Sequence, residues 1–194
     1  MTTAVAFLIS GRGSNMAALL AAMAEPDHPG RPVLVLSNRP EAAGLETARA
    51  AGVATAVIDH RAYADRPAFD RAVDAALRAA GAELVACAGF LRVMTPVLTT
   101  PWAGRMLNIH PSLLPLFPGL DTHARARAAG VAIHGCTVHE VTAELDSGPI
   151  LGQGAVPVCA GDTAETLAAR VLEMEHRLYP AVLRHFLTDP VGLR

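Results

Sequence analysis

The chain of 194 residues contains no lysine, so all 16 of its basic residues are arginine. A Walker A phosphate loop needs a lysine to reach the bound phosphates, and Schiff-base catalysis needs an amine side chain. Both kinds of site are therefore excluded. The 18 acidic residues give a formal net charge of −2, and no basic stripe appears along the sequence. We therefore expect no nucleic-acid partner.

Cysteine is also scarce, and the three cysteines are scattered, without a Cys-x-x-Cys pair. Cys87, Cys136 and Cys159 predict reduced thiols in a cytoplasmic protein. The first apolar run lacks a basic segment before it and is too short to span a bilayer, so we expect no membrane partner. His134 and His139 lie five residues apart, and the other histidines lack ligand partners at the usual spacings, so we expect no metal.

Apolar segments of strand length alternate with helical segments in the first half of the chain. This alternation predicts an α/β fold with a Rossmann-like, doubly wound, mostly parallel sheet and right-handed crossovers. With 52% hydrophobic residues, we expect one domain over residues 1–194. The expected strands are 4–9, 33–37, 55–58, 84–88, 106–110, 134–141 and 149–158, and the expected helices are 15–24, 41–51, 66–80 and 164–187.

The pattern changes after residue 110, where Pro111–Gly119 holds three prolines and predicts a loop. The last two expected strands are joined by a turn around Asp146, and we expect them to pair antiparallel in the C-terminal part of the sheet. Asp162 and Thr163 predict the N-terminal cap of the last helix. Pro180 falls inside that helix and predicts a kink or a break. Glycines just past two earlier helices, Gly52 and Gly81, predict C-terminal caps.

Asn108 and His110 stand two residues apart at the end of an apolar run, directly before Pro111. Side chains i and i+2 of a strand project from the same face, and a proline stops the strand. The pair is therefore expected at the carboxyl edge of the sheet, where α/β proteins bind ligands. The alternative is structural, since an asparagine at a strand end often satisfies backbone groups and a lone histidine is often simply packed.

Asp146 lies in a Gly/Pro-containing turn and offers a carboxylate, the natural partner of a histidine that must carry a proton. Together with Asn108 and His110 it indicates acyl-group chemistry. Asp146 could instead serve only as a turn residue, because the sequence alone does not place it beside His110.

A glycine-rich segment, Ser10-Gly11-Arg12-Gly13-Ser14-Asn15, joins the first strand to the first helix. Its backbone N–H groups and the helix N-terminus can hold an anion. The dinucleotide fingerprint needs a glycine at Met16 and an acidic residue near Asn38, so a phosphate monoester fits better than NAD. A tight turn that caps the helix is the alternative. The apolar stretch 89–94 suits an aromatic ligand and buried packing equally well.

Six motifs follow one another along the chain: Ile9–Asn15, Ala88–Arg92, Asn108–Pro115, Pro118–Leu120, His134–His139 and Leu145–Pro149. They resemble the glycinamide ribonucleotide transformylases, also called phosphoribosylglycinamide formyltransferases, within the folate-dependent formyltransferase family. The match that they mark runs from residue 4 to about 187. The Asn-x-His…Asp set is shared by all folate-dependent formyltransferases. The segment Ser-Gly-Arg-Gly-Ser-Asn narrows the resemblance to the glycinamide ribonucleotide transformylases. The resemblance implies a one-carbon transferase of de novo purine biosynthesis that moves the formyl group of 10-formyltetrahydrofolate to the primary amine of 5-phosphoribosylglycinamide.

The resemblance also implies a role for each half of the chain, with residues 1–100 binding phosphate and residues 101–194 carrying catalysis and the folate. The catalytic residues would be Asn108, His110 and Asp146. Substrate contacts would come from Gly13, Ser14 and Asn15 at the phosphate and, at the ribosyl part, from Glu175 and a preceding turn formed by Leu172, Glu173 and Met174. The folate would be bound by Arg66, Leu91, Arg92, Val93, Met94, Asn108, Thr142, Ala143, Glu144 and Leu145, without a metal.

Formyl transfer explains why these residue types belong together. The amine attacks the formyl carbon, and negative charge develops on the formyl oxygen. The Asn108 amide and protonated His110 can donate hydrogen bonds to that oxygen. Asp146 is expected to raise the pKa of His110 and to help move the proton from the amine to the leaving nitrogen. No covalent enzyme intermediate is required.

The sequence departs from the family pattern away from these three residues. Leu116 stands where many relatives carry lysine, and Arg125 or Arg127 could supply that cation. Asp121 stands where relatives often carry histidine, and a longer C-terminal tail is absent.

Two alternative functions are compatible with the motifs. The first is a formyltetrahydrofolate hydrolase, or a formyltransferase with another amine acceptor such as a sugar amine or aminoacyl-tRNA. The tRNA enzyme has an extra C-terminal domain and the hydrolase usually has an N-terminal regulatory domain, so the length disfavours both. The second is a non-catalytic sensor of a phosphate ligand. The expected partners are small molecules, bound by a monomer or homodimer.

Overall fold

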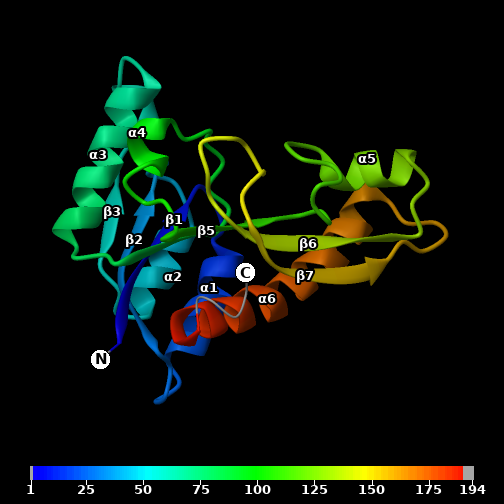
Figure 1. Cartoon of the computed structure of the whole chain (residues 1–194), viewed down its shortest axis with the longest axis horizontal. Helices are drawn as coiled ribbons and strands as arrows, with labels where there is room; N and C mark the ends of the chain where they lie inside the picture. The colour runs from blue at the N-terminus through cyan, green and yellow to red at the C-terminus, as the bar shows by residue number, and fades with distance from the viewer. Residues whose placement is uncertain (1, 190–194) are drawn as a thin grey trace.

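The computed structural model describes residues 2–189 and contains seven strands: β1 (Thr3–Ile9), β2 (Gly30–Ser37), β3 (Thr55–Val57), β4 (Leu84–Cys87), β5 (Met106–His110), β6 (Ile133–Glu140) and β7 (Ile150–Pro157). They form one sheet in the order β3-β2-β1-β4-β5-β6-β7 (Figure 1). β1 to β5 run parallel, whereas β6 pairs antiparallel with β5, and β7 with β6. The predicted Rossmann-like sheet, mostly parallel with antiparallel strands in its C-terminal part, is confirmed.

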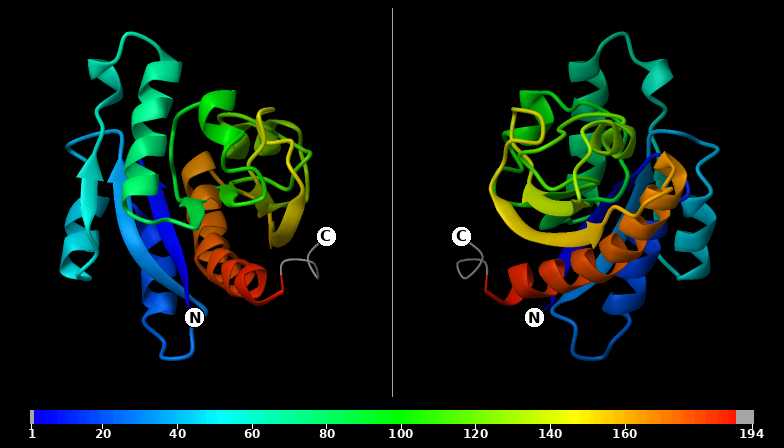
Figure 2. Two further views of the ribbon diagram at one scale, coloured as in Figure 1. Left: turned by 60° about the vertical axis from the view of Figure 1, so that its left-hand side comes forward. Right: turned by 90° about the vertical axis from the view of Figure 1, so that its right-hand side faces the viewer.

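Helices cover both faces of the sheet, and they are α1 (Ser14–Met23), α2 (Gly44–Ala50), α3 (Arg66–Ala79), α4 (Pro96–Thr99), α5 (Thr122–Ala128) and α6 (Ala164–Thr188), with a 3₁₀ turn, η1 (His60–Ala62). Residues of α1, α2 and α6 form one buried cluster with Val5, Phe7 and Ile9 of β1, and α3 and α4 pack with Ala6 and Leu8 on the opposite face (Figure 2). β1 is thus buried on both sides, which explains its unbroken apolar run.

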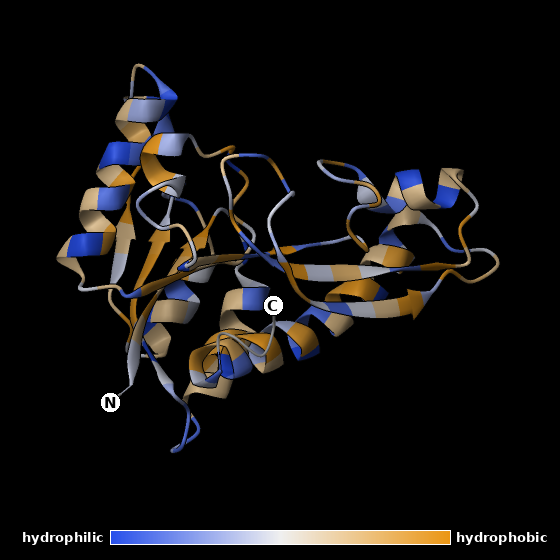
Figure 3. Cartoon of the chain, viewed as in Figure 1, coloured by the Kyte–Doolittle hydropathy of each residue, from blue (hydrophilic) through white to orange (hydrophobic). Residues whose placement is uncertain are grey.

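Apolar residues gather in the strands and on the inward sides of the helices (Figure 3). α3 illustrates the pattern, since Phe69, Val73 and Leu77 are buried at helical spacing. Within residues 2–189, no helix combines the length and apolar composition that crossing a bilayer requires.

Each expected strand and long helix is present within a few residues of its predicted bounds. The second helix begins at Gly44 rather than at residue 41. The short elements α4, α5 and η1 are not predicted by the sequence, because elements of three to seven residues are too short to display a hydrophobic period.

The predicted helix ends are confirmed. Gly52 and Gly81 adopt φ of +74° and +67° just after α2 and α3, and their N–H groups donate to the carbonyls of Arg49 and Arg78. Thr163 caps α6, where its hydroxyl accepts the Thr166 N–H.

Pro180 does not break α6, which is continuous from Ala164 to Thr188. Pro180 has no N–H to donate to the carbonyl four residues earlier. Its neighbours Tyr179, Val182 and Leu183 are buried against the sheet, and this packing holds the helix together across the missing bond. The predicted break is therefore wrong.

Tyr179 attaches α6 to the middle of the sheet. Its hydroxyl lies 3.2 Å from the carbonyl oxygens of both Cys87 on β4 and Leu107 on β5, so one buried O–H is shared between two neighbouring strands. This contact tethers the longest helix beneath the carboxyl edge that carries Asn108 and His110.

Replacing Tyr179 with phenylalanine is expected to lower the free energy of unfolding by about 1–2 kcal/mol, because two buried carbonyls lose a donor. Urea unfolding measures the change. Tyr63→Phe is the matched control, since the Tyr63 hydroxyl has no hydrogen-bond partner within the described residues. Equal losses in the two variants would contradict the anchoring role.

Candidate active site

Asn108 and His110 lie at the carboxyl end of β5, as the strand alternation predicts. The antiparallel register of β6 places His139 opposite Asn108 and Thr137 opposite His110. The Asn108 Nδ2 lies 3.2 Å from the His139 Nε2. His139 is not among the residues that the sequence predicts for the site. Only the β5–β6 register reveals it, and a single sequence carries no signal for that register.

Asp146 follows β6 in the turn before β7 and reaches back to both histidines. Its Oδ2 is 3.4 Å from the His110 Nδ1, and its Oδ1 is 3.7 Å from the His139 Nε2. The Gly119 N–H donates to Oδ2 at 2.9 Å. All three ionisable side chains are at most 7% exposed, so the carboxylate and the two imidazoles interact largely out of water.

His110 faces an acceptor at each ring nitrogen. Nδ1 points toward Asp146, and Nε2 lies 3.0 Å from the Phe117 carbonyl oxygen. A neutral imidazole carries one N–H and can donate to only one of these acceptors, whereas the imidazolium can donate to both.

His139 is the second imidazole of the cluster, and its environment favours the neutral form. Burial lowers the pKa of His139, so the ring is neutral at pH 7. Its Nδ1 lies 2.9 Å from the Glu140 carbonyl oxygen, which assigns the ring proton to Nδ1 and leaves Nε2 as an acceptor. The Asn108 amide donates one N–H to that Nε2, and its second N–H can be donated to a ligand.

Backbone strain concentrates around this cluster. Within residues 2–189, three residues other than glycine have a left-handed backbone: Phe117 with φ of 54°, Asp121 with 55° and Asp146 with 51°. Such conformations are uncommon for residues with a Cβ atom and persist where the surroundings enforce them. Phe117 and Asp146 both contact His110 directly, which indicates that the strain serves the site.

The predicted phosphate-binding residues lie at the start of α1. Gly13 has φ of +69°, and a Cβ there would lie 3.1 Å from the Gly44 Cα, so only glycine fits this turn. The Asn15 Nδ2 donates to the Glu175 Oε2 of α6 at 2.7 Å, while the Asn15 Oδ1 is buried without a partner. Burial raises the pKa of Glu175. The structure thus joins two predicted substrate residues that are 160 positions apart.

The other predicted ribosyl contacts do not join Asn15. The resemblance implies a turn at Leu172, Glu173 and Met174, directly before Glu175. This prediction is wrong, because all three residues lie within the continuous helix α6. Glu173 is exposed, because residues two apart on a helix point in nearly opposite directions. Met174 packs against β7, where its Cγ would lie 2.4 Å from a Cβ added at Gly154.

The predicted folate residues 91–94 follow β4 at the same edge of the sheet. Leu91 and Val93 are 67% and 49% exposed, whereas the Arg92 guanidinium lies over the Phe69 ring of α3. The loop is held at both ends: the Leu91 N–H donates to the Ser10 Oγ, and the Thr95 N–H and hydroxyl both donate to the buried carboxylate of Asp70.

The remaining predicted folate residues are also at the surface. The first residue of α3, Arg66, is exposed, and Thr142, Ala143, Glu144 and Leu145 form an exposed segment before Asp146. Among residues 2–189, no group of three or more histidine, cysteine or acidic side chains is arranged so that it could hold a metal ion.

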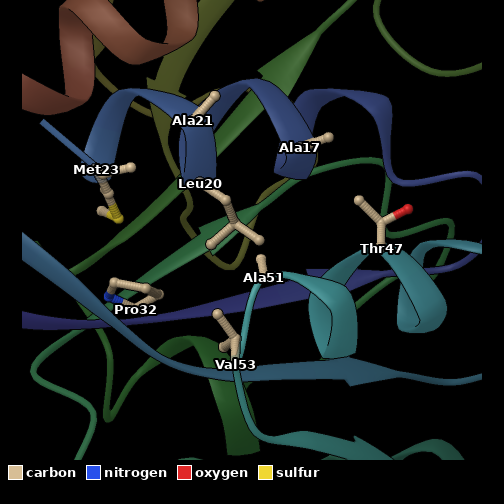
Figure 4. A pocket seen from close by; sticks show the side chains of 9 residues that line it. Ala17, Leu20, Ala21, Met23, Pro32, Thr47, Ala51 and Val53 are labelled. Carbon is tan, nitrogen blue, oxygen red and sulfur yellow. The ribbon is translucent and has the colours of Figure 1, made fainter.

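A groove of about 420 Å³ lies away from these residues, between α1, α2 and β2 (Figure 4). Its lining is almost wholly apolar and includes Leu20, Met23, Pro32 and Val53. None of the predicted site residues borders it, so it does not belong to the cluster around Asp146.

Comparison with known proteins places the chain in a family. The model of the formyl transferase family matches residues 3–183. The chain belongs to the formyl transferase family. The predicted resemblance to its phosphoribosylglycinamide formyltransferases is confirmed, since the phosphoribosylglycinamide formyltransferase of Escherichia coli is 44% identical, over 94% of this chain and 86% of its own.

Solved structures agree with this assignment. The phosphoribosylglycinamide formyltransferase of Brucella melitensis is 51% identical with a TM-score of 0.92, and the alignment covers 97% of each chain. The glycinamide ribonucleotide transformylase 1 of Symbiobacterium toebii is 48% identical with a TM-score of 0.94, over 96% of this chain and 88% of that one. The trifunctional purine biosynthetic protein adenosine-3 of Bos taurus is 47% identical over 97% of this chain, which spans about a fifth (19%) of that relative's length.

Three histidines near the site have depressed pKa values. Burial, followed by the charge of nearby His123, lowers the pKa of His134 from 6.5 to about 4. Burial likewise lowers the pKa of His123 and of His139. The His134 Nε2 lies 3.2 Å from the His123 Nδ1, and the Phe117 ring packs edge-on against His134.

These values predict that stability falls as the pH is lowered from 6.5 toward 4, because the unfolded chain then binds protons that the folded chain does not. His134 alone accounts for at most about 3 kcal/mol. Urea unfolding at pH 7.5 and pH 5 measures the fall, and His134→Asn should make it smaller. An unchanged or larger fall in the variant would contradict the assignment.

Proposed function

We propose that the protein transfers the formyl group of 10-formyltetrahydrofolate to the primary amine of 5-phosphoribosylglycinamide, a step of de novo purine biosynthesis. The observation that carries the proposal is the approach of Asn108, His110 and Asp146 at the carboxyl edge of the sheet. The names of the bacterial relatives supply the ribonucleotide, and the family supplies the formyl chemistry.

Asn108 and His110 stabilise the oxyanion that forms when the amine attacks the formyl carbon. The second N–H of the Asn108 amide is available because its first is donated to neutral His139. His110 contributes a positive charge, while its two ring nitrogens face Asp146 and the Phe117 carbonyl. Preorganised donors of this kind supply the largest single contribution in much acyl transfer, because they do not reorient as charge develops.

Asp146 balances the charge of His110 and receives the proton that the attacking amine must lose. The proton then passes to the leaving nitrogen of the folate, so the carboxylate ends the cycle ionised. Low exposure of the side chain strengthens its interaction with His110 relative to the same pair in water.

The start of α1 binds the phosphate of the ribonucleotide. Gly13, Ser14 and Asn15 present backbone N–H groups at a helix N-terminus, which favours an anion. Glu175 takes the ribosyl hydroxyls, and the unpaired buried Asn15 Oδ1 supports a polar ligand at this point. These residues need no lysine, in keeping with a chain that has none.

Exposed apolar side chains at the same edge form the folate pocket. Leu91, Val93 and Leu145 are 49–67% exposed and would be covered by the flat pterin ring. Arg66 would pair with the acidic glutamate end of the folate. The transfer itself requires no metal, because the oxyanion is stabilised by Asn108 and His110.

The protein is proposed to act in the cytoplasm on small molecules, as a monomer or homodimer. Cys87 and Cys136 are buried, Cys159 is exposed, and all three are free thiols, which supports a reducing compartment.

The purified chain mixed with 10-formyltetrahydrofolate and phosphoribosylglycinamide should release tetrahydrofolate only when the ribonucleotide is present. Release at the same rate without the ribonucleotide would identify a hydrolase instead. If both ligands bind but no tetrahydrofolate is released, the protein is a non-catalytic sensor and the proposal is wrong.

Asp146→Asn is expected to lower turnover by about a hundredfold or more, because the variant cannot accept a proton. Folding should be retained, since the asparagine oxygen can still accept the Gly119 N–H. Stopped-time assays measure the turnover of this variant. The control is Asp121→Asn, which changes an exposed acidic residue in the adjoining loop. Equal turnover of the wild type and Asp146→Asn would remove Asp146 from the mechanism.

Asn15→Ala is expected to raise the KM for the ribonucleotide while leaving the KM for the folate near that of the wild type. The side chain lies on α1 at the proposed phosphate end of the site, where it donates to Glu175 of α6. Steady-state kinetics with each substrate varied in turn makes the comparison. A change confined to the folate KM would overturn the placement of the phosphate.

A further inference from the structure

We propose that Arg125 is a positioning residue that fastens the segment 117–121, called the catalytic loop below, onto His110 and Asp146. This inference rests on the proposed formyl transfer. It assigns an effect on the rate of the chemical step to an exposed arginine of α5, although the Arg125 side chain contacts Phe117, Pro118 and Leu120 and none of the three proposed catalytic side chains.

The catalytic loop holds two of the three proposed catalytic side chains through its backbone. The Phe117 carbonyl accepts from the His110 Nε2 at 3.0 Å. The Gly119 N–H donates to the Asp146 Oδ2 at 2.9 Å. A small shift of this loop therefore changes the orientation of the imidazole and of the carboxylate together.

The conformation of the catalytic loop is unfavourable by itself. Phe117, Gly119 and Asp121 have φ of 54°, 78° and 55°, and two of these residues carry side chains that disfavour the left-handed region. A short segment with alternate left-handed residues relaxes unless other groups hold it in place. The loop accordingly needs a tether.

Arg125 supplies that tether from the helix that follows. Its Nη1 donates to the carbonyl oxygens of Pro118 and Leu120, and its guanidinium lies over the Phe117 ring, 5.7 Å from the centroid. One planar cation thus grips three of the five loop residues at once. The rigid fork of arginine suits this task, since a guanidinium can donate and stack simultaneously.

Arg127 provides an internal comparison on the same helix. Arg127 is also exposed. Because it lies two residues after Arg125 on the helix, its side chain projects in a different direction. Of the two arginines that could supply the cation missing at Leu116, Arg125 contacts the loop that follows Leu116, whereas the charge of Arg127 acts on Glu165 of α6. Among residues 2–189, no hydrogen bond joins the Arg127 side chain to the catalytic loop. Both arginines can be removed without opening a cavity in the core.

The test compares Arg125→Ala, Arg125→Lys and Arg127→Ala in steady-state formyl transfer, with each substrate varied in turn. Arg125→Ala is expected to lower kcat about tenfold or more while both KM values stay within about twofold, because misplaced groups slow chemistry more than binding. Arg125→Lys should fall between Arg125→Ala and the wild type, and Arg127→Ala should match the wild type.

Amide hydrogen exchange of the same variants gives a second readout that does not depend on turnover. The Gly119 amide should exchange faster in Arg125→Ala than in the wild type or Arg127→Ala, while urea unfolding midpoints stay alike. An Arg125→Ala variant with wild-type kcat, or one matched in kcat by Arg127→Ala, would overturn the inference. If the wild type transfers no formyl group, the proposed function fails, and unchanged Gly119 exchange in Arg125→Ala would separately refute the tether.

Discussion

A carboxylate removed from water between two imidazoles is the interaction around which this structure is organised. The Asp146 side chain is 7% exposed, and an ionised carboxylate at that depth is unfavourable unless charge and hydrogen bonds compensate it. The His110 Nδ1 lies 3.4 Å from this carboxylate, and the Gly119 N–H donates a hydrogen bond to it. These contacts come from β5, from the loop after it and from the turn after β6, so the carboxylate is stable only once three separate segments have assembled.

The reversal of strand direction between β5 and β6 makes that assembly possible. A purely parallel sheet would deliver only residues that follow successive strands to its carboxyl edge. Because β6 runs back antiparallel, it places His139 opposite Asn108, and the turn that follows β6 brings Asp146 within 3.4 Å of His110 and 3.7 Å of His139. The same edge carries the N-terminus of α1, and α6 crosses beneath it to bring Glu175 to Asn15. One edge of the sheet thus gathers the residues of the proposed site.

The two histidines of the cluster show how neighbours divide one residue type into two roles. Burial keeps His139 neutral, and its Nε2 accepts a hydrogen bond from the Asn108 amide. His110, in contrast, has an acceptor near each of its ring nitrogens. Strained backbone at Phe117, Asp121 and Asp146 indicates that the geometry is enforced rather than relaxed. Preorganisation of this kind is what charge stabilisation in a transition state requires.

Much of the fold was determined by local sequence. The apolar runs 4–9 and 84–88 and the helical spacing of Phe69, Val73 and Leu77 predict the parallel layers, and the spacing of Asn108 and His110 predicts a shared face, because periodicity is a property of neighbours in the chain. Short elements such as α5 and the continuity of α6 through Pro180 escape this reasoning, since packing against the sheet outweighs local preference.

The partnerships of the site were decided only by the tertiary structure. No local pattern specifies that His139 lies opposite Asn108, that Asn15 meets Glu175, or that Glu173 points away from that pair. The register of an antiparallel pair and the path of a long helix depend on the sum of contacts across the whole core, and a one-residue change in register would turn each side chain to the other face. The sequence therefore identified the candidate residues of the site, whereas the packing of the whole core decided which of them lie next to one another.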